Sequence, residues 1–89
     1  MTNNDFVFSL DLQHNINQLA DKSTLYNVVQ FVNNYTNVTI SYKQKVLKIL
    51  KFEDNLDLIK QNITQLIKKE CVQYKINKYI ESIIKKSFL

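Results

Sequence analysis

Along most of the chain, apolar residues recur at intervals of three and four, the spacing that gathers side chains on one face of an α-helix. The pattern is clearest in Ile59–Lys69, and it returns seventeen residues later in Ile76–Lys86. Looser copies of it begin at Tyr42, Leu25 and Phe8. The chain therefore has the pattern of about five successive amphipathic helices.

This pattern predicts an all-α fold, a small single-domain antiparallel bundle of four to five short helices that takes in residues 1–89. Residues 1–8 are expected to form an extended or irregular start, with Ser9 as the N-cap of the first helix. Connections of a few residues join the helices, as is usual in bundles. The helices are expected at about residues 9–20, 24–34, 42–53, 56–69 and 73–87.

The last two predicted helices are separated because their apolar faces do not line up. At about 100° per residue, the stripe through Ile59 and Ile63 would continue through Glu70 and Gln73, which are polar. The apolar residues that follow point more than about 100° away from that stripe. One straight helix would carry two unrelated apolar faces, so we expect a joint at Glu70–Gln73.

The start of the chain permits a second interpretation. In residues 6–12 and again in residues 37–42, apolar side chains recur at every second position, as they do in a half-buried strand. Two strands alone are marginally stable unless they pack on other elements. The alternative fold is therefore a set of helices with a two-stranded ribbon formed by 6–12 and 37–42.

The composition argues against several classes of enzyme. The chain has no glycine and no proline, so it lacks the residue on which phosphate-binding loops, dinucleotide fingerprints and nucleophile elbows depend. His14 and Cys71 are the single histidine and the single cysteine, too few for the usual structural zinc sites. We expect His14 on the surface and Cys71 as a packing residue, and we predict no catalytic residue, cofactor, metal or small-molecule substrate.

The charge is concentrated in the second half of the chain. Residues 43–89 hold eleven of the twelve lysines against five acidic residues, a net charge of +6, whereas residues 1–42 carry −2. In a five-helix bundle, helices two units apart share an end, which would bring Lys51 close to Lys85 and Lys86. The sequence therefore predicts one partner-binding patch, which consists of Lys48, Lys51, Phe52, Lys85, Lys86 and Phe88.

Cations mixed with aromatic side chains bind acidic peptides that carry hydrophobic anchors, and they also bind single-stranded nucleic acid. The leading expectation is a non-enzymatic helical module, an adaptor or inhibitor that docks on another protein or on itself. The alternative is sequence-tolerant nucleic-acid binding through the lysine-rich second half. The frequent Asn, Ile and Lys without Arg are typical of an AT-rich genome, such as that of a virus or phage.

The chain shows no targeting or membrane-spanning segment. Its first residues lack the features of a signal peptide, and no apolar run approaches the roughly 18–20 residues that span a bilayer. We therefore expect an intracellular, cytoplasmic protein with no membrane partner.

Overall fold

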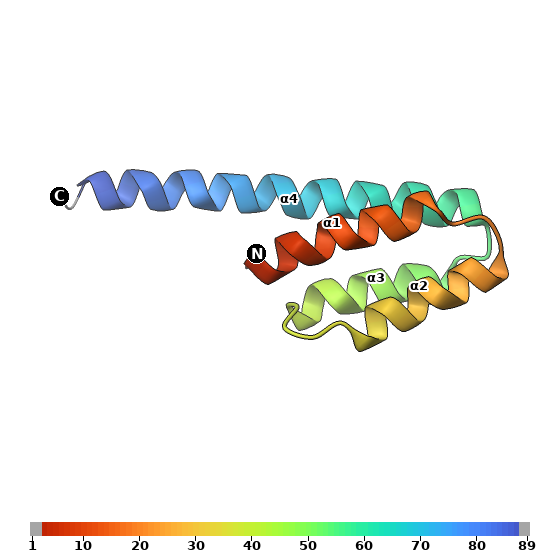
Figure 1. Cartoon of the computed structure of the whole chain (residues 1–89). Helices are drawn as coiled ribbons and strands as arrows, with labels where there is room; N and C mark the ends of the chain where they lie inside the picture. The colour runs from red at the N-terminus through yellow and green to blue at the C-terminus, as the bar shows by residue number, and fades with distance from the viewer. Residues whose placement is uncertain (1–2, 88–89) are drawn as a thin grey trace.

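The computed structural model describes residues 3–87, which form four α-helices and no strand (Figure 1). The prediction of a small all-α bundle is confirmed. The ribbon alternative is wrong, because residues 6–12 lie inside the first helix and residues 37–42 span a loop and the start of the third. The helices are α1 (Asn3–Asn17), α2 (Lys22–Asn34), α3 (Ile40–Phe52) and α4 (Leu56–Ser87).

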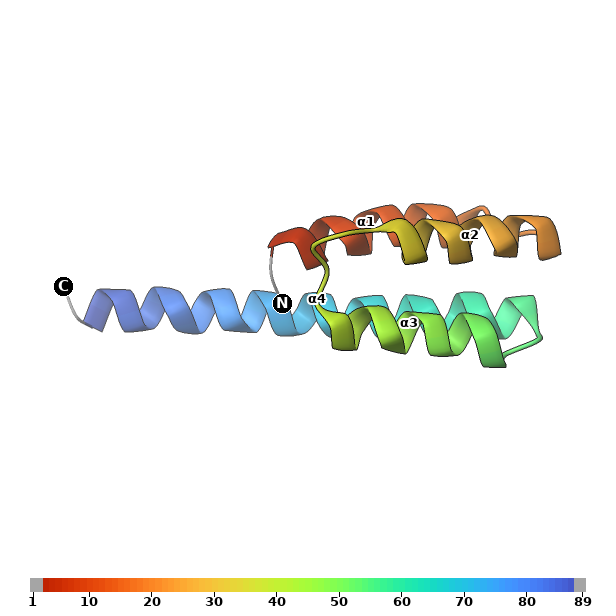
Figure 2. The same cartoon turned by 90° about the horizontal axis from the view of Figure 1, so that it is seen from below.

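The four helices pack side by side in a ring. α1 contacts α2 and α4, and α3 contacts the same two helices. Seen from below, α1 and α2 form one layer and α3 and the first half of α4 form the other (Figure 2). The second half of α4 continues past the other three helices, so the molecule measures 53 × 23 × 19 Å.

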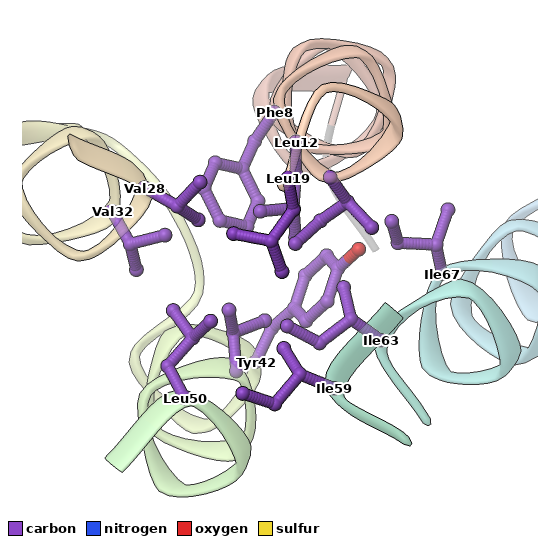
Figure 3. Close-up of a cluster of buried hydrophobic side chains, with 12 residues drawn as sticks. Phe8, Leu12, Leu19, Val28, Val32, Tyr42, Leu50, Ile59, Ile63 and Ile67 are labelled. Carbon is purple, nitrogen blue, oxygen red and sulfur yellow. The ribbon is translucent and has the colours of Figure 1, made fainter. Parts of the chain in front are cut away.

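The core lies where the apolar stripes of the four helices meet (Figure 3). Apolar residues spaced four positions apart along α1, α3 and α4 supply most of this core, as the amphipathic pattern predicts. The ring of Tyr42 projects from α3 into the middle of this cluster. The buried apolar residues are Phe8, Leu12, Ile16, Leu19, Val28, Val32, Tyr42, Val46, Leu50, Ile59, Ile63 and Ile67.

A buried polar network explains why α1 begins at Asn3 and not near residue 9. The carboxylate of Asp5 accepts hydrogen bonds from the backbone N–H of Thr39, at 2.8 Å, and from the Thr39 hydroxyl. Ser9 donates to the Asp5 carbonyl at 2.8 Å, and its oxygen lies 2.6 Å from the Tyr42 hydroxyl. The predicted irregular start is therefore wrong over residues 3–8, and Ser9 is a buried residue inside α1 and not its N-cap.

Polar residues end and start the helices in place of glycine and proline. Asp21 and Thr24 form a reciprocal capping box at the start of α2, and the hydrogen bonds from Thr24 lower the pKa of the Asp21 carboxyl. Asn37, with φ of 63°, takes the left-handed conformation in the α2–α3 loop. The side chain of Asn55 accepts from the N–H groups of Asp57 and Leu58 at the start of α4.

The predicted joint at Glu70–Gln73 is wrong, because α4 runs without interruption from Leu56 to Ser87. The segment that was expected to bend is instead held against the bundle. Glu70 lies 3.6 Å from the Lys45 ammonium, and the ring of Tyr74 stacks on Phe6 with centroids 5.3 Å apart. The change of apolar face occurs within a single continuous helix.

Candidate protein-interaction surface

The structure divides the binding patch that the sequence predicts. Lys48, Lys51 and Phe52 lie near the end of α3, beside the start of α4, whereas Lys85 and Lys86 lie in the last turn of α4. The length of α4, roughly 48 Å at 1.5 Å per residue, separates the two groups. Lys51 was expected close to Lys85 and Lys86 only because a joint in α4 would have turned the last helix back along the bundle, and that joint is absent. Phe88 lies outside the described residues.

The group at the end of α3 lies beside a shallow hollow that Phe52 lines. Phe52 is 73% exposed, and the Lys51 ammonium lies 5.8 Å from the centre of its ring. The hollow, of about 250 Å³, is also lined by Lys48, Ile49 and Asn62. A single aromatic ring with one cation above it is a small contact area, and the hollow offers little enclosure for a ligand.

A larger apolar surface lies on the second half of α4, and we call it the outer face. Its aliphatic side chains are 45 to 55% exposed, and Tyr79 is 69% exposed. The stripe is about 18 Å long from first to last residue at 1.5 Å per residue. The residues of the outer face are Val72, Ile76, Tyr79, Ile80, Ile83 and Ile84.

The outer face points away from the bundle. Ile59, Ile63 and Ile67 are buried on the side of α4 that packs on the other helices, and Tyr74 continues that side as far as Phe6. At 100° per residue, the middle of the outer face lies about 140° round the helix from that buried side, and only its last residue, Ile84, turns back to within about 60° of it. The bundle therefore cannot cover the outer face without a break in α4.

Within residues 72–87, lysines border the outer face on one side only. Lys75 and Lys86 fall within about 40° of Tyr79 round the helix, with Lys78 and Lys85 behind them. The opposite border carries uncharged amides, in which Gln73 donates to Asn77 at 3.0 Å. Four lysines and Glu81 give residues 72–87 a net charge of +3. The second half of α4 thus combines an apolar stripe with a basic border.

The second half of α4 owes its helical form mainly to contacts within the helix. Lys78 pairs with Glu81 at 3.7 Å and lies 5.6 Å above the Tyr74 ring. The two terminal lysines complement the helix dipole, while four β-branched isoleucines lower the helix propensity. Because isolated helices of this length are marginal in water, the packed first half must provide the nucleus from which this helix extends.

A second apolar hollow lies between α2 and the α3–α4 connection, at the opposite end of the molecule. It encloses about 580 Å³ and is lined by the aliphatic side chains of Leu25, Val29, Leu50 and Leu56. Tyr26 and several charged residues form its rim. This hollow lies within the bundle, and one of its lining residues, Leu50, is part of the buried core.

The single histidine and cysteine lie as expected. His14 is exposed on α1 and lies within hydrogen-bond distance of the Gln18 amide, at 3.1 Å, and Cys71 is half-buried against the core. Within residues 3–87, acidic, histidine and cysteine side chains form no group of three that could hold a metal ion. Over the same residues no helix, α4 included, has both the length and the apolar character needed to cross a membrane.

Comparisons of the chain with protein-family models, with curated proteins and with solved structures find no match. The assignment of a function therefore depends on the surface itself. The binding patch predicted from the sequence does not include the outer face, although the shift in apolar phase after Gln73 is the signal for it. That shift was interpreted as a bend in the chain, whereas in the structure it marks a second apolar face on the same helix.

Proposed function

We propose that the protein is a non-enzymatic helical interaction module that docks on another protein through the outer face of α4. The observation that carries this proposal is an apolar stripe, about 18 Å long, on a helix that extends beyond its own bundle. Contiguous exposed apolar surface of this kind in small proteins marks interaction sites. In this proposal the bundle of α1–α3 and the first half of α4 is the scaffold that holds the docking helix.

A photo-crosslinking amino acid placed at three positions tests this proposal in extracts of the source cells. Ile80 lies in the outer face, Leu10 is an exposed apolar residue on α1, and Phe52 belongs to the patch that the sequence predicts. We expect discrete protein adducts from position 80 and none of these adducts from position 10. The same adducts should disappear when Ile76→Asp is added, because a carboxylate in the stripe makes docking costly.

Crosslinks from each of the three positions would lead to a different conclusion about the docking site. The same adducts from positions 80 and 10 would show that the outer face has no special role. Adducts from position 52 alone would move the docking site to the end of α3. Circular dichroism of the Ile76→Asp variant is the control for folding, and it should match the parent because Ile76 is exposed.

Nucleic-acid binding is a second candidate, and the observation that favours it is the row of lysines beside Tyr79 on α4. It predicts that a fluorescent single-stranded oligonucleotide binds at low salt and is released steeply as salt rises, since each neutralised phosphate releases counterions. It also predicts that Ile76→Asp lowers this affinity only modestly, because the lysines remain. Absence of binding at low salt excludes this candidate.

A further inference from the structure

The charges that border the outer face indicate the chemistry of the segment that covers it. Within residues 72–87, Lys75 and Lys86 flank the stripe on one side, and the other side is neutral. The one carboxylate in this part of the helix, on Glu81, is 3.7 Å from Lys78 and lies on the side of the helix away from the stripe. Among the described residues of this part of α4, the outer face therefore presents positive charge along one edge with no carboxylate beside it.

We propose that the outer face binds an acidic amphipathic helix of another protein, with its carboxylates along the edge that meets Lys75 and Lys86. This inference rests on the proposed function and specifies the partner that the same surface takes. Opposite charges across an interface favour the correct partner and speed its association, while like charges exclude others. Apolar contact along the stripe supplies the attraction, and the lysines select the partner.

A helical partner fits the form of the stripe. Val72, Ile76, Tyr79 and Ile83 follow alternating steps of four and three, the spacing by which two helices pack along a shared seam. A helix also satisfies its own backbone hydrogen bonds, whereas an extended segment laid on α4 would find no backbone partner there. Ile80 widens the seam on the neutral side, where the partner helix can lie closest.

A second copy of this chain is a poorer occupant than an acidic helix. Pairing the second halves of two α4 helices would bring together eight lysines and two glutamates, a net charge of +6. The two glutamates would already be engaged by Lys78 within each copy. Like charges at such short range oppose association, most strongly at low salt.

Three designed helical peptides, matched in length and in their leucine seam, test the proposal directly on the intact protein. Glutamate, glutamine or lysine occupies the positions that border the seam, and fluorescence anisotropy gives the dissociation constant of each. We expect the glutamate peptide to bind roughly tenfold tighter than the lysine peptide at about 50 mM salt. The difference should shrink at about 500 mM salt, because screening weakens the charge pairs.

Charge reversal on the protein provides the matched control. Lys75→Glu with Lys86→Glu should reverse the order of the peptides, so that the lysine peptide binds more tightly. Lys22→Glu with Lys48→Glu makes the same change in net charge at exposed positions far from the outer face and should leave the order unchanged. If both double variants shift the order equally, the preference reflects net charge alone and the proposal is wrong.

The remaining outcomes separate this inference from the proposed function. Equal binding of all three peptides overturns the acidic partner but leaves docking through the outer face intact. A dimer in sedimentation that Ile76→Asp dissociates, with no peptide bound, would make a second copy the occupant. Binding to vesicles with anionic lipid, with no peptide bound, would make a membrane surface the occupant. If nothing binds and position 80 gives no crosslinks, both proposals fail.

Discussion

The two halves of α4 have the same apolar spacing but different surroundings. In the first half, Ile59 and Ile63 are completely buried against the other helices. In the second half, Ile76 and Ile80, seventeen residues further on, are about half exposed. The comparison shows that amphipathic spacing predicts a helix with an apolar face, but it does not identify the molecule that will cover that face.

Alanine substitution at matched positions is the strongest test of this comparison. Ile63→Ala should lower the free energy of unfolding by about 3 kcal/mol, because it leaves a cavity in a fully packed core. Ile80→Ala should change it by less than about 0.5 kcal/mol, since the side chain is exposed and alanine favours the helix. Urea unfolding followed by circular dichroism measures both. Similar losses at the two positions would show that the second half is also packed.

The pH dependence of stability reports on the packing around the first half, where Tyr42 lies in the core. Burial raises the pKa of the Tyr42 phenol to about 12, although its hydrogen bond with Ser9 lowers it. The unfolded phenol ionises near pH 10, so the stabilising effect of the neutral phenol is complete below pH 10. It is lost as the pH rises towards 12, by an amount on the order of 2–3 kcal/mol.

Tyr42→Phe is the control for this pH dependence, because lysines lose their charge over the same range of pH. The variant should be about 1 kcal/mol less stable at pH 7, where it lacks the hydrogen bond to Ser9. It should also lose less stability than the parent between pH 10 and pH 12. Parallel curves for the two proteins would mean that the phenol ionises without hindrance in the folded state.

Two tyrosines locate the boundary between the halves. Tyr74 stacks on Phe6, and its hydroxyl donates to the Asn3 side chain at 2.6 Å. Tyr74→Ala should therefore lower the free energy of unfolding by about 1–2 kcal/mol. Tyr79→Ala should leave stability within about 0.5 kcal/mol of the parent and weaken binding of the acidic peptide instead. If Tyr79→Ala proves as destabilising as Tyr74→Ala, the boundary lies further along α4.

The sequence predicted the middle of the fold better than its ends. The expected helices 24–34 and 42–53 agree within two residues with Lys22–Asn34 and Ile40–Phe52, because polar residues such as Asp21 and Glu53 mark their limits. The start of α1 was missed because Asp5 and Ser9, both polar, are buried there. Their partner residues, Thr39 and Tyr42, are more than thirty positions away in the chain, which no local pattern reveals.

The candidate site was harder to predict for a different reason. The joint at Glu70–Gln73 was predicted because one straight helix would carry two unrelated apolar faces. It also brought Lys51 next to Lys85, whereas the uninterrupted α4 places these residues near opposite ends of the molecule. The lysines and isoleucines were correctly recognised as parts of amphipathic helices. Only the three-dimensional arrangement shows which apolar face remains exposed.

Removal of residues 78–89 should have only a small effect on stability. Every side chain from Lys78 to Lys86 is exposed, and Lys78 contacts Tyr74 and Glu81 within α4 itself. Tyr74, which anchors α4 to α1, is retained. The free energy of unfolding should therefore fall by less than about 1 kcal/mol, the size of effect expected when the frayed end of a helix is lost. The far-ultraviolet helical signal should decrease in proportion to the helix removed.

This truncation separates the scaffold from its docking helix. The shortened chain keeps the twelve residues of the buried apolar core, the last of which along the chain is Ile67, but it loses Tyr79 and three of the isoleucines of the outer face. It should therefore unfold as cooperatively as the parent in urea while its affinity for the glutamate peptide disappears. A large loss of stability would contradict the comparison, because it would mean that the second half of α4 helps to hold the bundle together and does not only extend from it.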